Sequence, residues 1–201
     1  MSGDILGIDV GTSALKVAVF GPGLEQRCEA RRTYAPHVYD RGKADIEPEA
    51  WWQALRECCA ELSTSMAGLG VVSLSVTTPG LTPMAADGTA LGPAVLFLDG
   101  RSRAQSAAIR RIVGERRFLA ETCNLPVSGG SSLSSILWFQ EEQPDIWAAA
   151  AKFGHCNTYL IMRMTGRWAI RSAAPTLPAA GIRSRWSSPG QPPTRRGKWC
   201  T

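Results

Sequence analysis

Two apolar runs close to the N-terminus constrain the fold of this chain more than any other stretch. The runs are residues 5–10 and 15–20, both rich in β-branched side chains, and Gly-Thr-Ser stands in the connection between them. Runs of this length with a short polar connection are typical of a buried β-hairpin. We therefore expect polar chemistry to be confined to the turn.

The turn carries residue types that suit a metal-bound polyphosphate. Asp9 is a carboxylate at the end of an apolar strand, where an ionised group is costly unless it is paired, hydrogen-bonded or bound to a cation. Gly11 permits close approach of a ligand, and Thr12 and Ser13 offer hydroxyls and successive N–H groups. Lys16 can supply a counter-charge. We predict that Asp9 binds Mg²⁺ and that the turn binds phosphate, with an ordinary hairpin turn capped by Asp9 as the alternative.

Two common phosphate-binding motifs are absent from the sequence. No G-x-x-x-x-G-K-[ST] occurs anywhere in the chain, which excludes a P-loop. No G-x-G-x-x-G joins a strand to a helix, which excludes the dinucleotide-binding fingerprint. Neither of these two motifs can therefore be the source of phosphate binding in this chain.

Four further sequence blocks follow the hairpin. They are ADIEPEAWW at residues 44–52, PAVLFLDGRS at 93–102, SILW at 135–138 and YLIMRMTG at 159–166. The hairpin resembles the first phosphate-binding element of the actin-like ATPase superfamily, and the blocks resemble, in order, motifs of the FGGY carbohydrate kinases of the xylulose kinase type. The resemblance covers residues 4–170. It implies an α/β fold of the actin-like ATPase (ribonuclease H-like) class, with a mixed sheet flanked by helices.

The resemblance also implies a reaction. FGGY kinases transfer a phosphoryl group from ATP, with Mg²⁺, to a hydroxyl of a ketose or polyol. Ligands of open α/β sheets bind outside the carboxyl ends of strands, and two polar segments stand at such ends. Thr77 and Thr78 follow one expected strand, and Asp99 and Arg101 follow another. We expect these four residues to contact the sugar; turn chemistry for the threonines, and a helix N-cap and a surface charge for the other two, are the alternatives.

The sequence departs from the family pattern where the substrate is chosen. Residues 77–80 are Thr-Thr-Pro-Gly. The corresponding loop resembles Gln-Met-His-Gly in xylulose kinases and Gln-Arg-Glu-Thr in glycerol kinases. Gly130 and Ser135 stand where a Tyr of many glycerol kinases and a Lys of the family are expected. No position matches the catalytic aspartate, so no catalytic residue is assigned. We expect this chain alone to be inactive or nearly so, and a stand-alone sugar-binding or regulatory module is the alternative.

Residues 171–201 differ from the rest of the chain. They hold five prolines, five arginines and one lysine, and no acidic residue. Their six positive charges exceed the chain's formal net charge of +5, which leaves −1 on residues 1–170. We interpret 1–170 as an incomplete sugar-binding domain and 171–201 as a non-native or disordered tail from a frameshifted or prematurely ended gene, or else as a genuine divergent tail. Without interleaved aromatic residues or a known fold, nucleic-acid binding by this tail is disfavoured.

Composition narrows the setting in which we expect the protein to act. The six cysteines, at 28, 58, 59, 123, 156 and 200, form no C-x-x-C pair, and two histidines accompany them. We therefore expect reduced thiols in a cytoplasmic protein and no zinc site. No secretory signal or membrane span is expected, since no apolar run approaches about 18 residues. Apolar surface that a second lobe would cover favours a homodimer.

Periodicity and turn residues predict the remaining elements. We expect a third strand over 26–34, a loop over 35–43, an amphipathic helix over 48–62 and a strand over 71–76. Two further strands are expected over 81–85 and 94–98, and one helix over 102–117. Shorter helices follow over 118–123, 134–142, 145–151 and 157–164, the last capped by Gly166.

Overall fold

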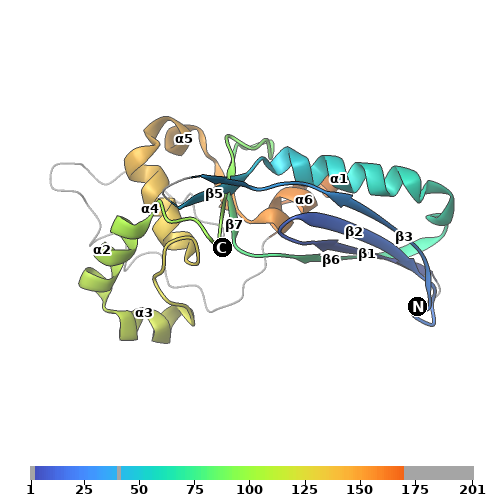
Figure 1. The fold of residues 1–201 in the computed structure, drawn as a ribbon, viewed down its shortest axis with the longest axis horizontal. Helices are drawn as coiled ribbons and strands as arrows, with labels where there is room; N and C mark the ends of the chain where they lie inside the picture. Colours follow the sequence, from blue (N-terminus) through green and yellow to red (C-terminus); the bar gives the residue numbers. More distant parts are fainter. Residues whose placement is uncertain (1–2, 40–41, 170–201) are drawn as a thin grey trace.

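The computed structural model describes residues 3–39 and 42–169, which form two sheets and the helices around them (Figure 1). The strands are β1 (Asp4–Val10), β2 (Ala14–Phe20), β3 (Gln26–Thr33), β4 (His37–Tyr39), β5 (Lys43–Ile46), β6 (Leu69–Val76), β7 (Gly80–Met84), β8 (Ala94–Leu96) and β9 (Lys152–Gly154). The helices are α1 (Pro48–Glu61), the short 3₁₀ helix η1 (Ser63–Ser65), α2 (Arg103–Val113), α3 (Glu115–Thr122), α4 (Ser132–Glu142), α5 (Pro144–Ala149) and α6 (Cys156–Thr165).

The first sheet has the strand order β3-β2-β1-β6. Strand β2 pairs antiparallel with both β1 and β3, and β6 pairs parallel with β1, so the sheet is mixed. The predicted hairpin is confirmed, with Val10 opposite Leu15 at its closed end. Alternate residues of β1 point to one face, and this face carries the buried Leu6, Ile8 and Val10.

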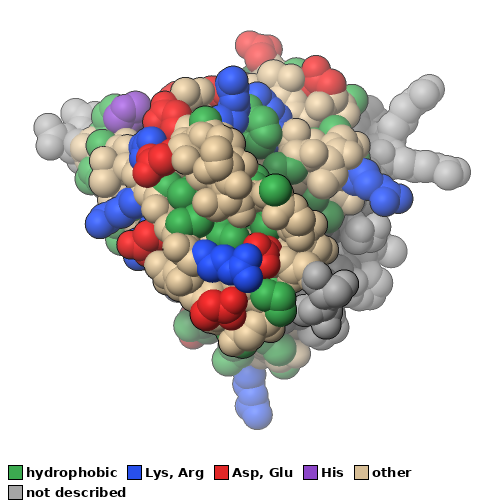
Figure 2. Space-filling view, turned by 90° about the vertical axis from the view of Figure 1, so that its right-hand side faces the viewer, with side chains coloured by type: hydrophobic (Ala, Val, Ile, Leu, Met, Phe, Trp, Pro, Cys, Tyr) green, Lys and Arg blue, Asp and Glu red, His purple; other side chains and the backbone are tan. Residues whose placement is uncertain are grey.

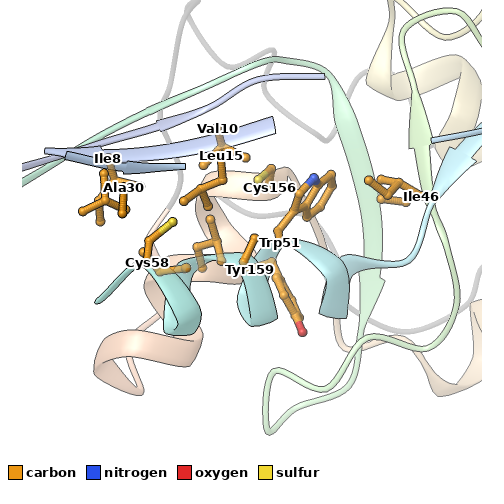
Figure 3. Close-up of a cluster of buried hydrophobic side chains, with 14 of the residues drawn as sticks. Ile8, Val10, Leu15, Ala30, Ile46, Trp51, Cys58, Cys156 and Tyr159 are labelled. Carbon is orange, nitrogen blue, oxygen red and sulfur yellow. The ribbon is translucent and has the colours of Figure 1, made fainter. Parts of the chain in front are cut away.

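Helices α1 and α6 pack on that buried face (Figure 1). Helix α1 begins with Pro48, a residue that suits the first turn of a helix because its missing N–H has no partner there anyway. Figure 3 shows the resulting core, in which side chains of β1 and β2 meet side chains of both helices. Its largest fully buried members include Leu15 and Tyr159, and Cys58 faces this core while Cys59 is only partly buried.

A second sheet of short strands, in the order β4-β5-β8-β7-β9, joins this core to the other end of the molecule. Helices α2 to α5 occupy that end, far from the β1–β2–β3 ribbon in Figure 1. A separate apolar cluster holds α4 against the sheet through Ile136, Phe139 and Phe153. The opposite end, seen in Figure 2, has acidic and basic side chains interspersed, with no large area of one sign.

Most predicted elements are present, with three corrections. The single helix expected over 102–117 is wrong, because Gly114 adopts φ +83° and ψ 135°, a non-helical conformation that ends α2 and starts α3. The loop expected over 35–43 contains β4 and the first residue of β5, which pair as an antiparallel ribbon. Strand β9 was not expected at all; its three residues pair with β7.

Several predictions fall on residues that the structure does not describe. The tail over 171–201, including Cys200, lies outside the described residues. The other five cysteines are free thiols. No helix in the described part of the chain is long and apolar enough to cross a membrane.

Candidate functional site

The β1–β2 turn is closed by its own backbone. The Gly11 N–H donates to the Ala14 carbonyl oxygen at 2.8 Å, so this N–H is used inside the turn. A Cβ on Gly11 would lie 3.1 Å from the same oxygen, a tight contact. The Gly11 N–H is therefore not free to bind a phosphate. Thr12 and Ser13 are exposed, and no backbone partner is found for their N–H groups among residues 3–39 and 42–169.

Asp9 and Lys16 face each other across the hairpin. They are directly opposite in the β1–β2 register, and both are exposed. Because opposite residues of an antiparallel pair point to the same face, the two charges lie side by side above the sheet. Neither forms an ion pair within the described part of the chain. A lone carboxylate of this kind fits Mg²⁺, which is held by one or two carboxylates together with water and substrate phosphates.

The Thr77 loop lies against the same turn. The Thr77 N–H donates to the Val10 carbonyl oxygen at 2.7 Å, which continues the parallel pairing of β1 and β6 beyond the strand end. Gly11, Thr12 and Thr77 all line one small hollow at this edge of the sheet, with a free volume of about 10 Å³, roughly the space of one water molecule. The phosphate-binding turn and the sugar loop predicted from sequence are therefore brought together, with Thr78 exposed beside them.

The floor of the hollow is apolar and was missed by the sequence analysis. Trp51, from the first turn of α1, is almost fully buried there, and Cys156 reaches it from the start of α6. Phe97 also lines the hollow and is 42% exposed, which is unusual for a large aromatic side chain. Burial raises the pKa of the Cys156 thiol well above its ordinary value, so the thiol is neutral.

Tyr34 braces the turn from β3's side. Its hydroxyl donates to the Gly11 carbonyl oxygen at 2.7 Å, and its N–H donates to the Ser13 carbonyl oxygen at 3.0 Å. Burial raises the pKa of the Tyr34 phenol, and the negative charge of Asp9 raises it further. Tyr34 therefore stays a neutral donor and fixes both ends of the three-residue turn.

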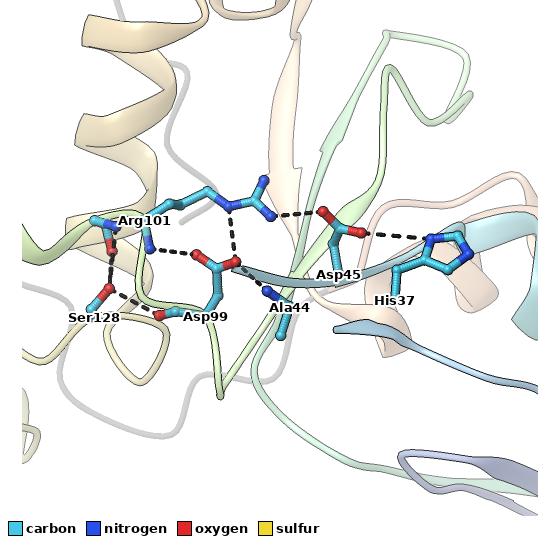
Figure 4. Close-up of polar contacts among 7 residues, drawn as sticks. His37, Ala44, Asp45, Asp99, Arg101 and Ser128 are labelled. Atoms are coloured by element: carbon cyan, nitrogen blue, oxygen red, sulfur yellow. Dashed lines mark hydrogen bonds and ion pairs between the residues drawn. The ribbon is translucent and has the colours of Figure 1, made fainter. Parts of the chain in front are cut away.

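Asp99 and Arg101 form a buried ion-pair network (Figure 4). The Asp99 side chain is fully buried and accepts from the Ala44 N–H at 2.7 Å, the Arg101 N–H at 2.9 Å and the Arg101 Nε at 2.8 Å. Arg101 Nη2 donates to Asp45 Oδ2 at 2.7 Å. Both oxygens of Asp99 are thus occupied from within the chain, and its direct contact with a sugar stays a prediction.

The network is extended by neighbours on two other elements, α4 and β4. The Arg101 guanidinium stands 5.1 Å from the centre of the Trp138 ring of α4, a cation–π geometry. His37 Nδ1 lies 3.8 Å from Asp45 Oδ1, an oxygen without a hydrogen-bond partner in the described part of the chain. The N-cap of α2 is Ser102, not Asp99, and Arg101 is largely buried. Asp99 is therefore not a helix N-cap and Arg101 is not a surface charge, the two alternatives given in the sequence analysis.

Residues 128 and 129 contact the segment that carries Phe97 and Asp99. The Ser128 hydroxyl donates to the Asp99 carbonyl oxygen at 2.9 Å. Gly129 has φ +69°, and a Cβ there would lie 2.4 Å from the Phe97 carbonyl oxygen and 2.7 Å from that of Asp99. Only glycine fits this approach, so the loop before α4 fixes the position of the 97–101 segment.

Comparison with known proteins shows the family to which this chain belongs. Residues 4–174 match the model of the N-terminal domain of the FGGY family of carbohydrate kinases. The chain belongs to the FGGY family. It is 33% identical to a xylulose kinase of Staphylococcus epidermidis over 163 residues, which are 78% of this chain and 31% of that protein. It is 28% identical to the xylulose kinase of Escherichia coli over 189 residues, 90% of this chain and 38% of the other.

Solved structures agree on the fold of this FGGY domain. The crystal structure of xylulose kinase from Rhodospirillum rubrum matches with a TM-score of 0.78 at 24% identity, over 83% of this chain and 35% of that one. The predicted actin-like ATPase fold, with a mixed sheet flanked by helices, is confirmed. This FGGY chain spans about a third of the length of these relatives.

Proposed function

We propose that this chain is the sugar-binding, N-terminal part of a carbohydrate kinase that transfers a phosphoryl group from ATP to a hydroxyl of a ketose or polyol. The observation that carries the proposal is the hydrogen bond from the Thr77 N–H to the Val10 carbonyl oxygen, which sets the Thr77 loop against the β1–β2 turn in a chain of the FGGY family. We place the protein in the cytoplasm, where its free thiols stay reduced.

On the nucleotide side, Asp9, Thr12, Ser13 and Lys16 are the proposed ligands. Asp9 would hold Mg²⁺, directly or through water, and the exposed N–H and hydroxyl groups of Thr12 and Ser13 would take phosphate oxygens. Lys16, opposite Asp9, adds a positive charge near the same phosphates. Bound Mg²⁺ neutralises phosphate charge in such transfers.

On the sugar side, hydroxyl groups stand over an apolar floor. Thr77 and Thr78 are the proposed hydrogen-bonding partners of the sugar hydroxyls, and Phe97 suits the C–H groups of a carbon chain. We also propose that Asp99 and Arg101 contact the sugar. The hydrogen bond between their side chains fixes both residues close in sequence to Phe97. The choice between ketose and polyol is left to experiment.

We propose further that the isolated chain has little or no kinase turnover, because none of its residues matches the family's base. A carboxylate that accepts the hydroxyl proton is part of such catalysis. A chain that binds sugar without turnover would act instead as a sugar-binding or regulatory module. ATP consumption in the presence of D-xylulose separates the two: measurable turnover by the purified chain would contradict the inactive assignment.

Binding itself is tested by thermal unfolding with D-xylulose, with MgATP and with both. A ligand at about 100 times its Kd stabilises the folded state by about 2.7 kcal/mol, which raises Tm by roughly 5–10 °C in a domain of this size. We expect Thr77→Val to remove the shift with D-xylulose and to leave that with MgATP. Asp9→Asn should do the reverse.

Thr33→Val is the matched control, since Thr33 is exposed on β3 and lies outside the hollow. It should keep both shifts. An absence of any shift with D-xylulose, glycerol or MgATP would overturn the proposal, and so would equal effects of the two threonine variants.

A further inference from the structure

The β1–β2 turn consists of Gly11, Thr12 and Ser13, which lie between the two strands. Under the proposed function its phosphate donors include backbone N–H groups, so their direction depends on how the peptide units of the turn are held. Within the turn, the Gly11 N–H donates to the Ala14 carbonyl oxygen, a bond that holds the Val10–Gly11 unit. The units that carry the Thr12 and Ser13 N–H groups therefore depend on contacts from outside the turn.

Tyr34, the residue that follows β3, makes two such contacts. Its hydroxyl donates to the Gly11 carbonyl oxygen at 2.7 Å, and its N–H donates to the Ser13 carbonyl oxygen at 3.0 Å. The ring is partly buried and packs against the core cluster that includes Val10 and Leu15. The core therefore fixes the hydroxyl, and the hydroxyl fixes a carbonyl group of the turn.

The bond to Gly11 also sets the direction of the next N–H group. In a trans peptide unit the C=O and N–H groups lie in one plane and point in opposite directions. Because the Gly11 carbonyl points at the Tyr34 hydroxyl, the Thr12 N–H of the same unit points away from Tyr34. Among the described residues, those that line the hollow include Gly11 and Thr12 but not Tyr34. The Thr12 N–H is therefore held on the side of the unit opposite to the Tyr34 support.

Gly11 makes this support necessary. Glycine restricts its own backbone dihedral angles less than any other residue, so steric contacts do little to fix the direction of its carbonyl group. At the other end of the turn, the bond from the Tyr34 N–H holds the carbonyl of Ser13 in the same way. The unit that carries the Ser13 N–H lies between these two fixed units. One residue outside the turn thus restrains the direction of its free N–H groups.

We propose that Tyr34 is a positioning residue for phosphate binding, whose hydroxyl holds the Gly11–Thr12 peptide unit so that the Thr12 N–H meets a phosphate oxygen of MgATP. Tyr34 acts through the turn and does not itself touch the phosphate. Burial raises the pKa of its phenol, so the hydroxyl is a donor throughout the neutral range. This inference rests on the proposed function, which assigns phosphate to the turn.

The variant Tyr34→Phe removes the hydroxyl and keeps the ring that packs against the core. Because one hydrogen bond to the turn is lost, we expect the Kd for MgATP to rise about three- to tenfold. The Kd for D-xylulose should stay unchanged, since the Thr77 N–H bonds to the Val10 carbonyl oxygen rather than to Gly11. Isothermal titration calorimetry of the full chain measures both constants.

Amide NMR spectra separate positioning from support of the fold. In the wild type, saturating MgATP should move the Thr12 amide proton downfield, as a new hydrogen bond to a phosphate oxygen does. In Tyr34→Phe the same proton should move less far at saturation. An identical movement in the two proteins would refute the positioning role, whatever the loss of stability in the variant.

The other two tyrosines of the chain provide matched controls. Tyr39→Phe changes an exposed residue of β4. Tyr159→Phe removes another partly buried hydroxyl, which donates to Glu49 Oε2 at 3.0 Å and has no bond to the turn. Both variants should keep the wild-type Kd for MgATP, even where Tyr159→Phe lowers the melting temperature.

The possible outcomes distinguish this inference from the function on which it rests. A wild-type chain that does not bind MgATP would overturn the nucleotide side of the proposed function together with the role of Tyr34. Binding of MgATP with the same Kd in the wild type and in Tyr34→Phe would overturn the role of Tyr34 alone. An equal rise of the Kd in Tyr159→Phe would do the same, because it would show a general effect of lost stability.

Discussion

Replacing Arg101 by methionine gives the sharpest test of the network beneath the candidate site. The guanidinium is 11% exposed and bridges two carboxylates, Asp99 at 2.8 Å and Asp45 at 2.7 Å. Methionine keeps much of the volume and removes the charge and all donors. Breaking a buried ion pair by removal of one partner costs about 3–5 kcal/mol, because an uncompensated charge stays behind.

The structure indicates where that cost falls. Without the side chain of residue 101, Asp99 still accepts two backbone hydrogen bonds, from residue 101 itself and from Ala44. Asp45 loses its hydrogen bond and keeps, in the described part of the chain, only His37 at 3.8 Å. Asp45→Asn in the Arg101→Met background should therefore recover about 1–3 kcal/mol, since it removes the stranded charge.

Urea unfolding followed by circular dichroism measures these free energies. With a slope of about 2 kcal/mol per molar urea, Arg101→Met should lower the midpoint by roughly 2 M, and Arg101→Lys, which keeps the charge, should lie between it and the wild type. Arg116→Met, at an exposed position of α3, should change stability by less than about 0.5 kcal/mol. A loss below about 1 kcal/mol for Arg101→Met, or a further loss on adding Asp45→Asn, would refute the reasoning.

Three further outcomes are expected. Gly129→Ala should lower the free energy of unfolding by about 1–3 kcal/mol more than Gly114→Ala. Both positions have positive φ, but only Gly129 has backbone oxygens within 3 Å of the new Cβ. Equal melting temperatures of the two variants would contradict this. Leu15→Ala, in the core, should cost about 2–5 kcal/mol in urea unfolding, against nearly nothing for Leu24→Ala at the surface. Burial lowers the pKa of His155 from 6.5, so the unfolded chain binds its proton more readily, and the free energy of unfolding should fall as pH drops below about 6.5; His155→Gln should flatten this slope, and an unchanged slope would argue against it.

The sequence analysis succeeded where local pattern decides the structure. The β1–β2 hairpin follows from two apolar runs and a polar turn, and α1 follows from its apolar period and Pro48. The prediction of a single helix over 102–117 was wrong, because apolar spacing alone does not indicate that Gly114 adopts a non-helical φ of +83°. Strand β9 is three residues long and exists only through pairing with β7, so no local signal marks it.

Polar residues of the candidate site carry a signal in the sequence, and its apolar residues do not; the roles of both stay predictions. Asp9 and Thr77 stand out because polar residues follow strands of apolar sequence. The sequence pattern identifies Trp51 only as an apolar residue of a helix. Its place in the hollow depends on how α1 packs against β7. The two elements are so close that a Cβ on Gly80 would lie 3.2 Å from the Trp51 ring. The bond from Arg101 to Asp45 joins residues 56 positions apart, a distance over which residue types alone do not indicate partners.

The parallel pairing of β1 with β6 also bears on the order in which this domain folds. β1, β2 and β3 are joined by short turns and can pair with little loss of chain entropy, whereas Ile8 meets Leu74 only after the whole segment between them has been closed into a loop. The Thr77 loop reaches the β1–β2 turn through that pairing. Ligand-binding competence should therefore arise late in refolding, after the antiparallel ribbon has formed, and any event that delays β6 should delay the site with it.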